Sequence, residues 1–291
     1  MSISAIIDPR PRRDEARLVQ ALRGHSGAAV ALYAGAGDTF VRKTAPGPSG
    51  NLRLRQQAIK QRLFGAQGFA FPAVRRLAQD AGARAFFEMD YVPGRTLSEL
   101  VAGAVPFDRA RVLQAVAHLI GAFAASAQGV LDEAQFHRKI DSIVAQSQAS
   151  PAVAALGRRL AACDWRGIPQ SLDHGDLTLE NMLLAQDGRI VFIDCDAAWV
   201  SSWWLDIGKL FQDLDGRWFL RALAAPSLDA LESLHRLAGD FRGLAQALDP
   251  RLPLRLAQLA ALHLFRTVPY AAAPAAAFAC AAAARLLEIA P

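Results

Sequence analysis

Residues 174–183 read HGDLTLENML and bring several side chains with catalytic potential close together. Asp176 is followed five residues later by Asn181, and Asp194 lies thirteen residues beyond Asn181, at the end of the apolar run IVFID. Carboxylate and amide oxygens are ligands that Mg²⁺ prefers, so Asn181 and Asp194 are candidate metal ligands. Asp176 is a candidate to accept or orient the proton of an attacking hydroxyl group. His174, Asp176, Leu177 and Asn181 match the catalytic-loop pattern H-x-D-L-x-x-x-N, which indicates Mg²⁺-assisted phosphoryl transfer from ATP.

The elements that must position these residues are indicated by the pattern around them. Two short apolar runs, MLLA and IVFID, are separated by QDGR, and a D-G pair between such runs predicts a β-hairpin. This hairpin would bring the loop that carries Asp176 and Asn181 beside the strand that ends at Asp194. The spacing is therefore consistent with one site built from a loop and a hairpin.

The rest of the chain predicts strands near the N-terminus and helices after about residue 106. The predicted elements are a helix over 13–23, two strands within 27–45, a loop over 46–51, a helix over 52–64, two strands within 71–92 around Gly82, a turn and a short helix over 93–100 with Thr96 as N-cap, and helices over 107–126, 133–147, 151–162 and beyond 203. We therefore expect an α+β fold with a β-rich lobe over residues 1–92 and a helical lobe over residues 93–291. The cleft between two such lobes is a favoured place for a ligand.

The segment 174–196 resembles the aminoglycoside phosphotransferase and choline kinase-like family of small-molecule kinases. That family's signature looks like HGDLxxxNxL, followed by an apolar strand and IDxxxA, and Gly175 is typical of it where protein kinases usually have Arg. The resemblance implies a two-lobed, protein-kinase-like fold with a small antiparallel sheet and one main helix in the N-lobe. It also implies that Asp176 is the catalytic base and that Asn181 and Asp194 bind the metal.

The same resemblance assigns roles to residues elsewhere in the chain. His174 would pack beneath the loop in a structural role. Lys43, in VRK, would contact the α- and β-phosphates of ATP, and a compact ammonium group suits phosphate. The segment MDYVPG is similar to the inter-lobe hinge, with Met89 at the back of the adenine pocket.

At that hinge, the Asp90 carbonyl and the Val92 N–H would bond the adenine edge. WWLDIGKL resembles a family segment in which an Asp opens a helix, so Asp206 would brace the catalytic loop through backbone N–H groups.

One departure from the family concerns the partner of Lys43. The family normally has a Glu on the small-lobe helix, whereas the helix predicted over 52–64 has none. Gln56 shares the predicted apolar face with Leu52, Ile59 and Leu63, so Gln56 is the first candidate for that position and Gln57 the second. An amide would give Lys43 a neutral hydrogen bond in place of an ion pair.

Two further departures from the family concern the predicted phosphate-binding loop and the residues that follow Asp194. The loop AGAGDT is short, although Gly35 and Gly37 would permit close backbone approach to phosphate. After Asp194 the sequence continues Cys-Asp without a Gly, and Asp196 is a candidate carboxylate behind the metal ligands.

Three residues of the second lobe are candidates for contact with the acceptor. The Trp203 ring could stack on a sugar or fill the core, and Asp213 could bond substrate hydroxyls or lie on a solvated face. Arg266 interrupts an apolar helix, and because a buried Arg needs a partner, it could reach an anionic substrate.

Composition limits the remaining function classes. The 291-residue chain has a net charge of +5 without a basic stripe or interleaved aromatic residues, which disfavours nucleic acid and suits a phosphate-rich ligand. Three widely spaced cysteines without a CxxC pair indicate neither zinc nor disulfides, and a reducing, cytoplasmic setting fits best. The apolar run YAAAPAAAFACAAAARLL is mostly Ala and is broken by Pro274, so it predicts a buried helix and not a membrane span.

The prediction is an ATP- and Mg²⁺-dependent phosphotransferase that acts on a hydroxyl group of a small molecule. Beyond residue 200, nine Lys or Arg balance eight Asp or Glu, which favours a neutral or anionic acceptor such as a sugar over a polycationic antibiotic. An aminoglycoside kinase stays open, as does a non-catalytic nucleotide-binding protein, which only the missing Glu supports. A protein kinase is disfavoured by Gly175 and by the short interval from Asp194 to Asp206.

Overall fold

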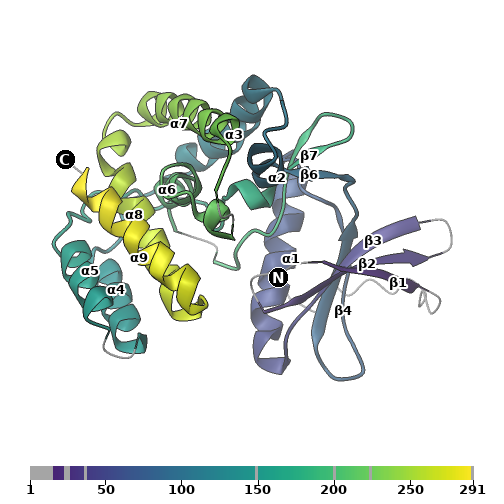
Figure 1. The fold of residues 1–291 in the computed structure, drawn as a ribbon. Coiled ribbons are helices and arrows are strands. Elements are labelled where there is room, and N and C mark those ends of the chain that lie inside the picture. The colour runs from purple at the N-terminus through teal and green to yellow at the C-terminus, as the bar shows by residue number, and fades with distance from the viewer. Residues whose placement is uncertain are drawn as a thin grey trace. The chain divides into compact units, whose positions relative to one another are not determined.

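The computed structural model describes residues 16–22, 27–35, 38–147, 150–198, 201–222 and 225–289. The chain divides into two compact units (Figure 1). Unit 1 comprises Met1–Gly94 together with Leu183–Ala198, and unit 2 comprises Arg95–Met182 together with Trp199–Pro291. The sequence indicated a single boundary after residue 92, and the return of 183–198 to unit 1 was not anticipated.

Unit 1 is built on an antiparallel five-stranded sheet with the order β1-β2-β3-β5-β4. Its strands are β1 (Arg17–Leu22), β2 (Ala29–Gly35), β3 (Asp38–Thr44), β4 (Val74–Gln79) and β5 (Ala85–Asp90). The strand pairs predicted within 27–45 and 71–92 are confirmed. In the loop predicted over 46–51, the structure forms one short 3₁₀ turn, η2 (Pro48–Gly50).

The prediction of a helix over residues 13–23 is wrong for the part that the structure describes. Residues 17–22 form strand β1, which pairs with β2 from Arg17 opposite Ala34 to Leu22 opposite Val30. In so short a window, apolar residues at helical and at strand spacing are hard to distinguish. Hydrogen bonding to the neighbouring strand decides the conformation, because an isolated helix of this length is marginal in water.

Helix α1 (Asn51–Ala66) is present as predicted, but its buried face differs from the prediction. Leu52 and Leu63 are 68% and 46% exposed, whereas Leu54, Ala58 and Phe64 are buried. The buried face also carries polar side chains, namely Gln57, Lys60 and Gln61. Apolar spacing misassigned the face because Lys60 and Gln61 find hydrogen-bond acceptors inside the unit, so their burial does not leave them unsatisfied.

A three-stranded sheet with the order β6-β7-β8 contains the predicted hairpin. Its strands are β6 (Gly94–Thr96), β7 (Met182–Ala185) and β8 (Ile190–Phe192). The predicted D-G turn is confirmed, with Gly188 at φ +82° and its N–H bonded to the Ala185 carbonyl at 2.9 Å. Strand β6 was not predicted. A side chain at Gly94 would place its Cβ 2.5 Å from the Leu184 carbonyl oxygen, so glycine allows β6 to approach β7.

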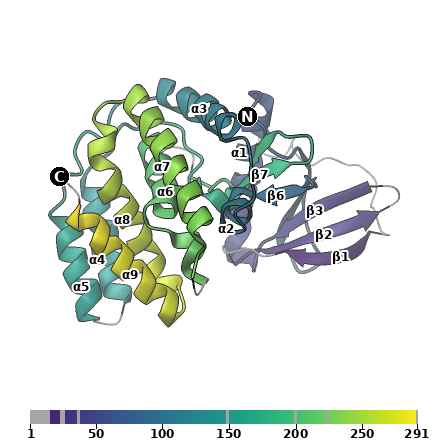
Figure 2. The same ribbon diagram turned by 45° about the horizontal axis from the view of Figure 1, so that its top comes forward.

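Unit 2 is helical, as predicted (Figure 2). Its helices are α2 (Leu97–Ala102), α3 (Arg109–Ala125), α4 (Ala134–Gln146), α5 (Pro151–Ala161), α6 (Trp203–Leu214), α7 (Leu228–Leu248), α8 (Leu256–Thr267) and α9 (Ala273–Glu288). The predicted N-cap of α2 is confirmed, because Thr96 and Glu99 form a reciprocal capping box. Helix α8 packs against α6 and α9, and most of its side chains are buried. No helix among the described residues has the length and apolar character needed to cross a membrane.

Candidate active site

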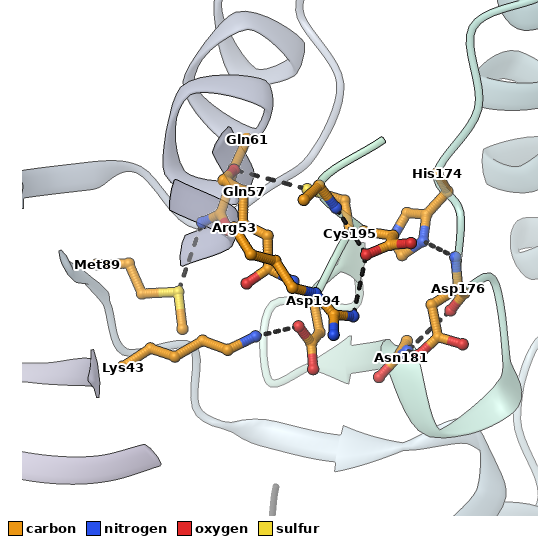
Figure 3. Close-up of polar contacts among 12 residues, drawn as sticks. Lys43, Arg53, Gln57, Gln61, Met89, His174, Asp176, Asn181, Asp194 and Cys195 are labelled. Atoms are coloured by element: carbon orange, nitrogen blue, oxygen red, sulfur yellow. Dashed lines mark hydrogen bonds and ion pairs between the residues drawn. The ribbon is translucent and has the colours of Figure 1, made fainter. Parts of the chain in front are cut away.

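In unit 1, the candidate site centres on Lys43 and Asp194 (Figure 3). Lys43 lies on β3, opposite Phe87 of β5, and only 3% of it is exposed. Its ammonium group donates to Asp194 Oδ1. Asp194 has φ +57°, a left-handed conformation that Asp tolerates better than most residues. The backbone that follows β8 is therefore turned so that the Asp194 carboxylate meets the buried Lys43.

Strand alternation separates Lys43 from its neighbour Arg42. The Arg42 guanidinium pairs with Glu88, at 3.1 Å from Nε and 2.6 Å from Nη2, and lies 4.7 Å from the ring centres of both Tyr33 and Phe86. Successive side chains of a strand point to opposite faces, so Arg42 and Lys43 lie on opposite faces of the sheet and have different partners. Glu88, which sequence analysis did not single out, engages Arg42 and leaves Lys43 to Asp194.

The segment that follows Asp194 is held against helix α1 by hydrogen bonds. Arg53 Nη2 bonds Asp196 Oδ1 at 3.1 Å, the Cys195 thiol donates to the Gln57 carbonyl at 3.8 Å, and Lys60 donates to the Ala198 carbonyl. Burial raises the pKa of the Cys195 thiol to about 12, so it stays protonated. This thiol therefore has a packing role and no nucleophilic one.

The glutamines that lie on the buried face of α1 are not the one that was predicted first as the partner of Lys43. Gln56 is half-buried, whereas Gln57 and Gln61 lie on the buried face. Gln61 donates to the Pro72 carbonyl at 2.7 Å and to Met89 Sδ at 3.4 Å. The contact of Lys43 is with Asp194, and a role for Gln56 beside Lys43 stays a prediction.

The segments predicted to hold adenine and phosphate are only partly described. The Asp90 carboxylate pairs with Arg75, which also pairs with Asp38. Gly35 ends β2 opposite Asp38, and a Cβ there would make only an ordinary 3.8 Å contact, so its space alone does not demand glycine. Gly37 lies outside the described residues. Nucleotide contacts by Gly35, Met89, Asp90 and Val92 stay predictions.

In unit 2, the candidate site centres on Asp176 and Asn181. The Asn181 amide nitrogen donates to the Asp176 carbonyl at 2.8 Å and to its carboxylate at 2.9 Å. The short turn η3 (Leu179–Asn181) makes this contact possible by bringing Asn181 back toward the loop. With its nitrogen held in this way, the amide directs its oxygen away from Asp176.

A lysine that sequence analysis missed contacts the predicted base. Lys209 Nζ lies 3.1 Å from Asp176 Oδ1. Burial raises the pKa of Asp176, but the Lys209 charge, its hydrogen bond and the Asn181 amide together hold the pKa below the ordinary value for Asp. The signal was present in WWLDIGKL, because Lys209 lies three residues after Asp206 and therefore on the same face of a helix.

Helix α6 holds the catalytic loop at successive turns. Asp206 accepts the N–H groups of His174 at 2.6 Å and Gly175 at 2.8 Å, so the contacts implied for Asp206 are present. One turn later Lys209 meets Asp176, and a further turn later Asp213 accepts the Leu179 N–H at 2.8 Å. The loop's geometry is thus set by one helix face.

The loop itself needs both of the residues that precede Asp176. Gly175 has φ +87°, which a residue with a side chain rarely adopts. His174 is fully buried, and its Nδ1 accepts the Asp176 N–H at 3.3 Å. Its position matches the structural role that the resemblance implied.

Two predictions about the acceptor are contradicted by burial. Trp203 is 3% exposed and packs edge-on against Trp204 at 6.2 Å, so its ring cannot stack on a sugar. Asp213 is 1% exposed and holds the Leu179 N–H, so it lies neither on a solvated face nor beside a substrate hydroxyl. Both residues face the core because α6 buries most of its surface. Asp196 pairs with Arg53, and Arg266 is half-buried beside His263.

Each unit offers an oxygen donor of the kind that Mg²⁺ prefers. Among the described residues, no three His, Cys, Asp or Glu side chains form a metal cluster. Magnesium usually takes only one or two protein oxygens and completes its shell with water and substrate phosphates. Lys43 engages one oxygen of Asp194, and the outward amide oxygen of Asn181 is a hard donor of the same kind. These residues therefore fit the ion that their types predicted.

The model of one protein family, described as "Phosphotransferase enzyme family", matches residues 17–227. The chain belongs to this family. The match spans both units and includes Lys43, Asp176, Asn181 and Asp194, so the resemblance seen in residues 174–196 becomes a family assignment for most of the chain. No curated protein sequence matches this member of the phosphotransferase family.

Solved structures confirm the protein-kinase-like α+β fold of this phosphotransferase. Aminoglycoside phosphotransferase APH(4)-Ia, in a ternary complex with ADP and hygromycin B, is similar with a TM-score of 0.62 at 16% identity, covering 94% of this chain and 95% of that one. APH(3'')-Id from Streptomyces rimosus has a TM-score of 0.59 at 19% identity, covering 85% and 92%. A microcompartment-associated aminopropanol kinase has a TM-score of 0.58 at 15% identity, covering 99% and 94%.

Proposed function

We propose that this phosphotransferase moves the γ-phosphoryl group of ATP, with Mg²⁺, to a hydroxyl group of a small molecule, and that the acceptor is a sugar or a related metabolite. The family assignment supports the reaction type. The ADP in the APH(4)-Ia complex supports the nucleotide, although that likeness extends only to the fold. The reaction joins the acceptor oxygen to the γ-phosphorus, while the bond from this phosphorus to the leaving ADP oxygen breaks.

The observation that carries the proposal is the contact between Asp176 and Asn181. Both Asn181 hydrogen bonds fix the Asp176 backbone and carboxylate, and Lys209 keeps the pKa of that carboxyl low. Asp176 is therefore ionised at neutral pH and held in one orientation. A fixed carboxylate of this kind orients the acceptor hydroxyl and takes its proton as the new oxygen–phosphorus bond forms.

The other residues bind and orient the nucleotide. Lys43, buried and directed at Asp194, presents its ammonium group to the nucleotide's phosphates, and Asn181 and Asp194 hold the metal. When bound, Mg²⁺ neutralises charge on the β- and γ-phosphates. Asp206 and His174 act on the loop only, by holding its backbone.

Two alternative functions rest on different observations. An aminoglycoside kinase is favoured by the fold likeness to APH(4)-Ia and APH(3'')-Id, whose complexes contain hygromycin B and streptomycin. A non-catalytic nucleotide-binding protein rests on the missing Glu of α1. The second alternative has less support, because Asp194 supplies Lys43 with a carboxylate partner.

The test is a coupled ATP-consumption screen over sugars, amino alcohols and aminoglycosides with wild-type protein. With an acceptor found, Asp176→Ala and Asp194→Ala should each lower kcat by about 100-fold or more, because each removes a group that acts on the reacting atoms. Asp141→Ala, an exposed change on α4, is the matched control and should keep wild-type turnover. Circular dichroism should report the same fold for all variants. Wild-type turnover in either active-site variant would contradict the proposal.

A further inference from the structure

The charges around Asp176 in unit 2 bear on which acceptors can approach it. The Lys209 side chain is 17% exposed and reaches Asp176 from α6, while the Asp176 carboxylate is 41% exposed. A hydroxyl group that approaches this carboxylate therefore also approaches an ammonium group whose charge is only partly screened by water. A group next to the reactive hydroxyl then lies near this cationic side chain, part of whose charge is offset by Asp176.

A second cation extends this positive region along α8. His263 is buried, and its Cδ2 would lie 3.5 Å from a Cβ placed on Gly208, the neighbour of Lys209. Arg266 Nη1 lies 3.5 Å from His263 Nδ1, one turn along the helix. Burial, then the charges of Arg266 and Lys209, lower the pKa of His263, so this imidazole is neutral. Arg266 therefore lies beside a neutral ring, on a helix that carries no acidic residue.

Arg266 also acts on a neighbouring lysine. Lys139 of α4 has its pKa lowered, chiefly by burial and then by the positive charge of Arg266. Helix α4 packs against α8 in this unit. The positive region therefore includes side chains from three helices, α4, α6 and α8, and α8 carries no carboxylate.

The carboxylates of residues 173–181 and 203–215 are buried or paired with cations, and α8 has none. Within residues 173–181, 203–215 and 256–267, all of which the structure describes, the acidic side chains fall into two groups. Three are 2% exposed or less, namely Asp173, Asp206 and Asp213. The other three pair with cations, namely Asp176 with Lys209, Glu180 with Arg221 at 3.9 Å and Asp215 with Arg242 at 2.6 Å. An ammonium group on an acceptor would find no exposed, unpaired carboxylate on these segments.

We propose that Lys209 and Arg266 select acceptors by charge, so that this phosphotransferase prefers a hydroxyl compound with a neutral or anionic group, such as a carboxylate, and disfavours hydroxyl compounds that carry ammonium groups, such as aminoglycosides. This inference rests on the proposed function and narrows its acceptor class. Lys209 acts beside the reacting hydroxyl, and Arg266 acts farther along the same positive region. Fixed cations of this kind both attract the anionic acceptor and repel the cationic one.

The experiment uses two series of acceptors that differ only in charge. One series is glucuronate, glucose and glucosamine, and the other is glycerate, glycerol and 3-amino-1,2-propanediol, with kanamycin as a polycationic probe. ATP consumption by the wild-type protein should give a kcat/KM for the anionic or neutral member that exceeds that of the cationic member by about 10-fold in at least one series.

The variants separate charge selection from a general loss of activity. Arg266→Gln should reduce the 10-fold preference at least threefold, mainly through the KM of the anionic acceptor. Lys209→Gln should reduce the preference as well, because it removes the cation that lies 3.1 Å from the Asp176 carboxylate. Arg236→Gln is the matched control, since Arg236 is an exposed α7 residue paired with Glu232.

The outcomes distinguish the inference from the proposed function. ATP consumption that is fastest with a cationic acceptor or kanamycin, or that ignores acceptor charge, would overturn the inference and leave the kinase activity standing. Unchanged preference in Arg266→Gln would overturn the role of Arg266 even if Lys209→Gln were inactive. No consumption with any acceptor would overturn the proposed function, and the inference with it.

Discussion

At the scale of single residues, the catalytic loop depends on carboxylates that serve different purposes. Asp176 is kept ionised by a cation, whereas Asp206 accepts two backbone N–H groups. Asp213 is the exception, because one of its oxygens accepts the Leu179 N–H and the other is buried without a hydrogen-bond partner among the described residues. Burial therefore raises the pKa of Asp213 to about 7.

This raised pKa predicts a pH-dependent stability. The folded protein keeps a proton on Asp213 that the unfolded chain loses near pH 4, so the free energy of unfolding should fall as pH rises from about 4 to about 7, by up to about 4 kcal/mol. Asp213→Asn cannot titrate, yet its amide oxygen can still accept the Leu179 N–H. The variant should lose this part of the slope.

Urea unfolding in the absence of nucleotide and metal, from about pH 5 to about pH 8, measures the difference. The slope is the readout, because the buried amide group adds a cost that does not change with pH. Asp141→Asn, on the exposed face of α4, should keep the wild-type slope. Equal slopes for wild type and Asp213→Asn would show that Asp213 is ionised in the fold.

At the scale of elements, α6 is the helix on which the unit 2 part of the site depends. Its Asp206, Lys209 and Asp213 hold the catalytic loop, while its other face packs against α8. Gly208 lies at that packing surface, and a Cβ there would be 2.5 Å from Leu259 Cβ. The missing side chain lets the two helices approach closely, and this approach sets the position of the loop.

We expect Gly208→Ala to destabilise the protein by about 1–3 kcal/mol, because the added methyl group would push α6 away from α8. Gly239→Ala on α7 is a matched control, since nothing lies within 4 Å of its added Cβ. That control should be neutral or more stable by up to about 1 kcal/mol, as alanine favours a helix interior. Thermal and urea unfolding compare the two. Equal stability of the two variants would show that α6 and α8 tolerate the added volume.

At the scale of the whole molecule, unit 1 is assembled from two separate stretches of the chain. Phe192 donates its N–H to the Ala70 carbonyl at 2.8 Å, and its ring lies 5.9 Å from that of Phe71. Lys43 and Lys60 find their acceptors at Asp194 and Ala198. The stretch 183–198 therefore satisfies buried groups of the stretch before residue 94.

Because unit 1 needs both stretches, we predict that residues 1–94 do not form a stable unit alone. Without 183–198, Lys60 loses the Ala198 carbonyl and Lys43 loses the Asp194 carboxylate, and breaking a buried ion pair is strongly destabilising. We expect the 1–94 fragment to melt without a cooperative transition. A fusion that appends residues 183–198 through a flexible Gly/Ser linker should restore one, as circular dichroism can measure. Cooperative melting of the shorter fragment would contradict this account.

The sequence alone indicated the chemistry that we propose for the candidate site. Asp176, Asn181 and Asp194 were found from their types and spacing, because phosphoryl transfer restricts which side chains can serve and the D-G turn restricts how they connect. Most strands and helices and the Thr96 cap were also predictable, since local hydrogen bonding and periodicity specify them.

Tertiary structure decided which faces and partners these elements use. Strand β1 depends on pairing with β2, and the buried face of α1 depends on acceptors supplied by Pro72 and Ala198, which lie far apart in the chain. In the sequence, residue type alone does not distinguish Lys209 from a lysine on the surface. Its role becomes visible only in the structure, where α6 places it beside Asp176. Such contacts form between distant segments, so their energies appear only once packing has placed the groups within a few ångströms of each other.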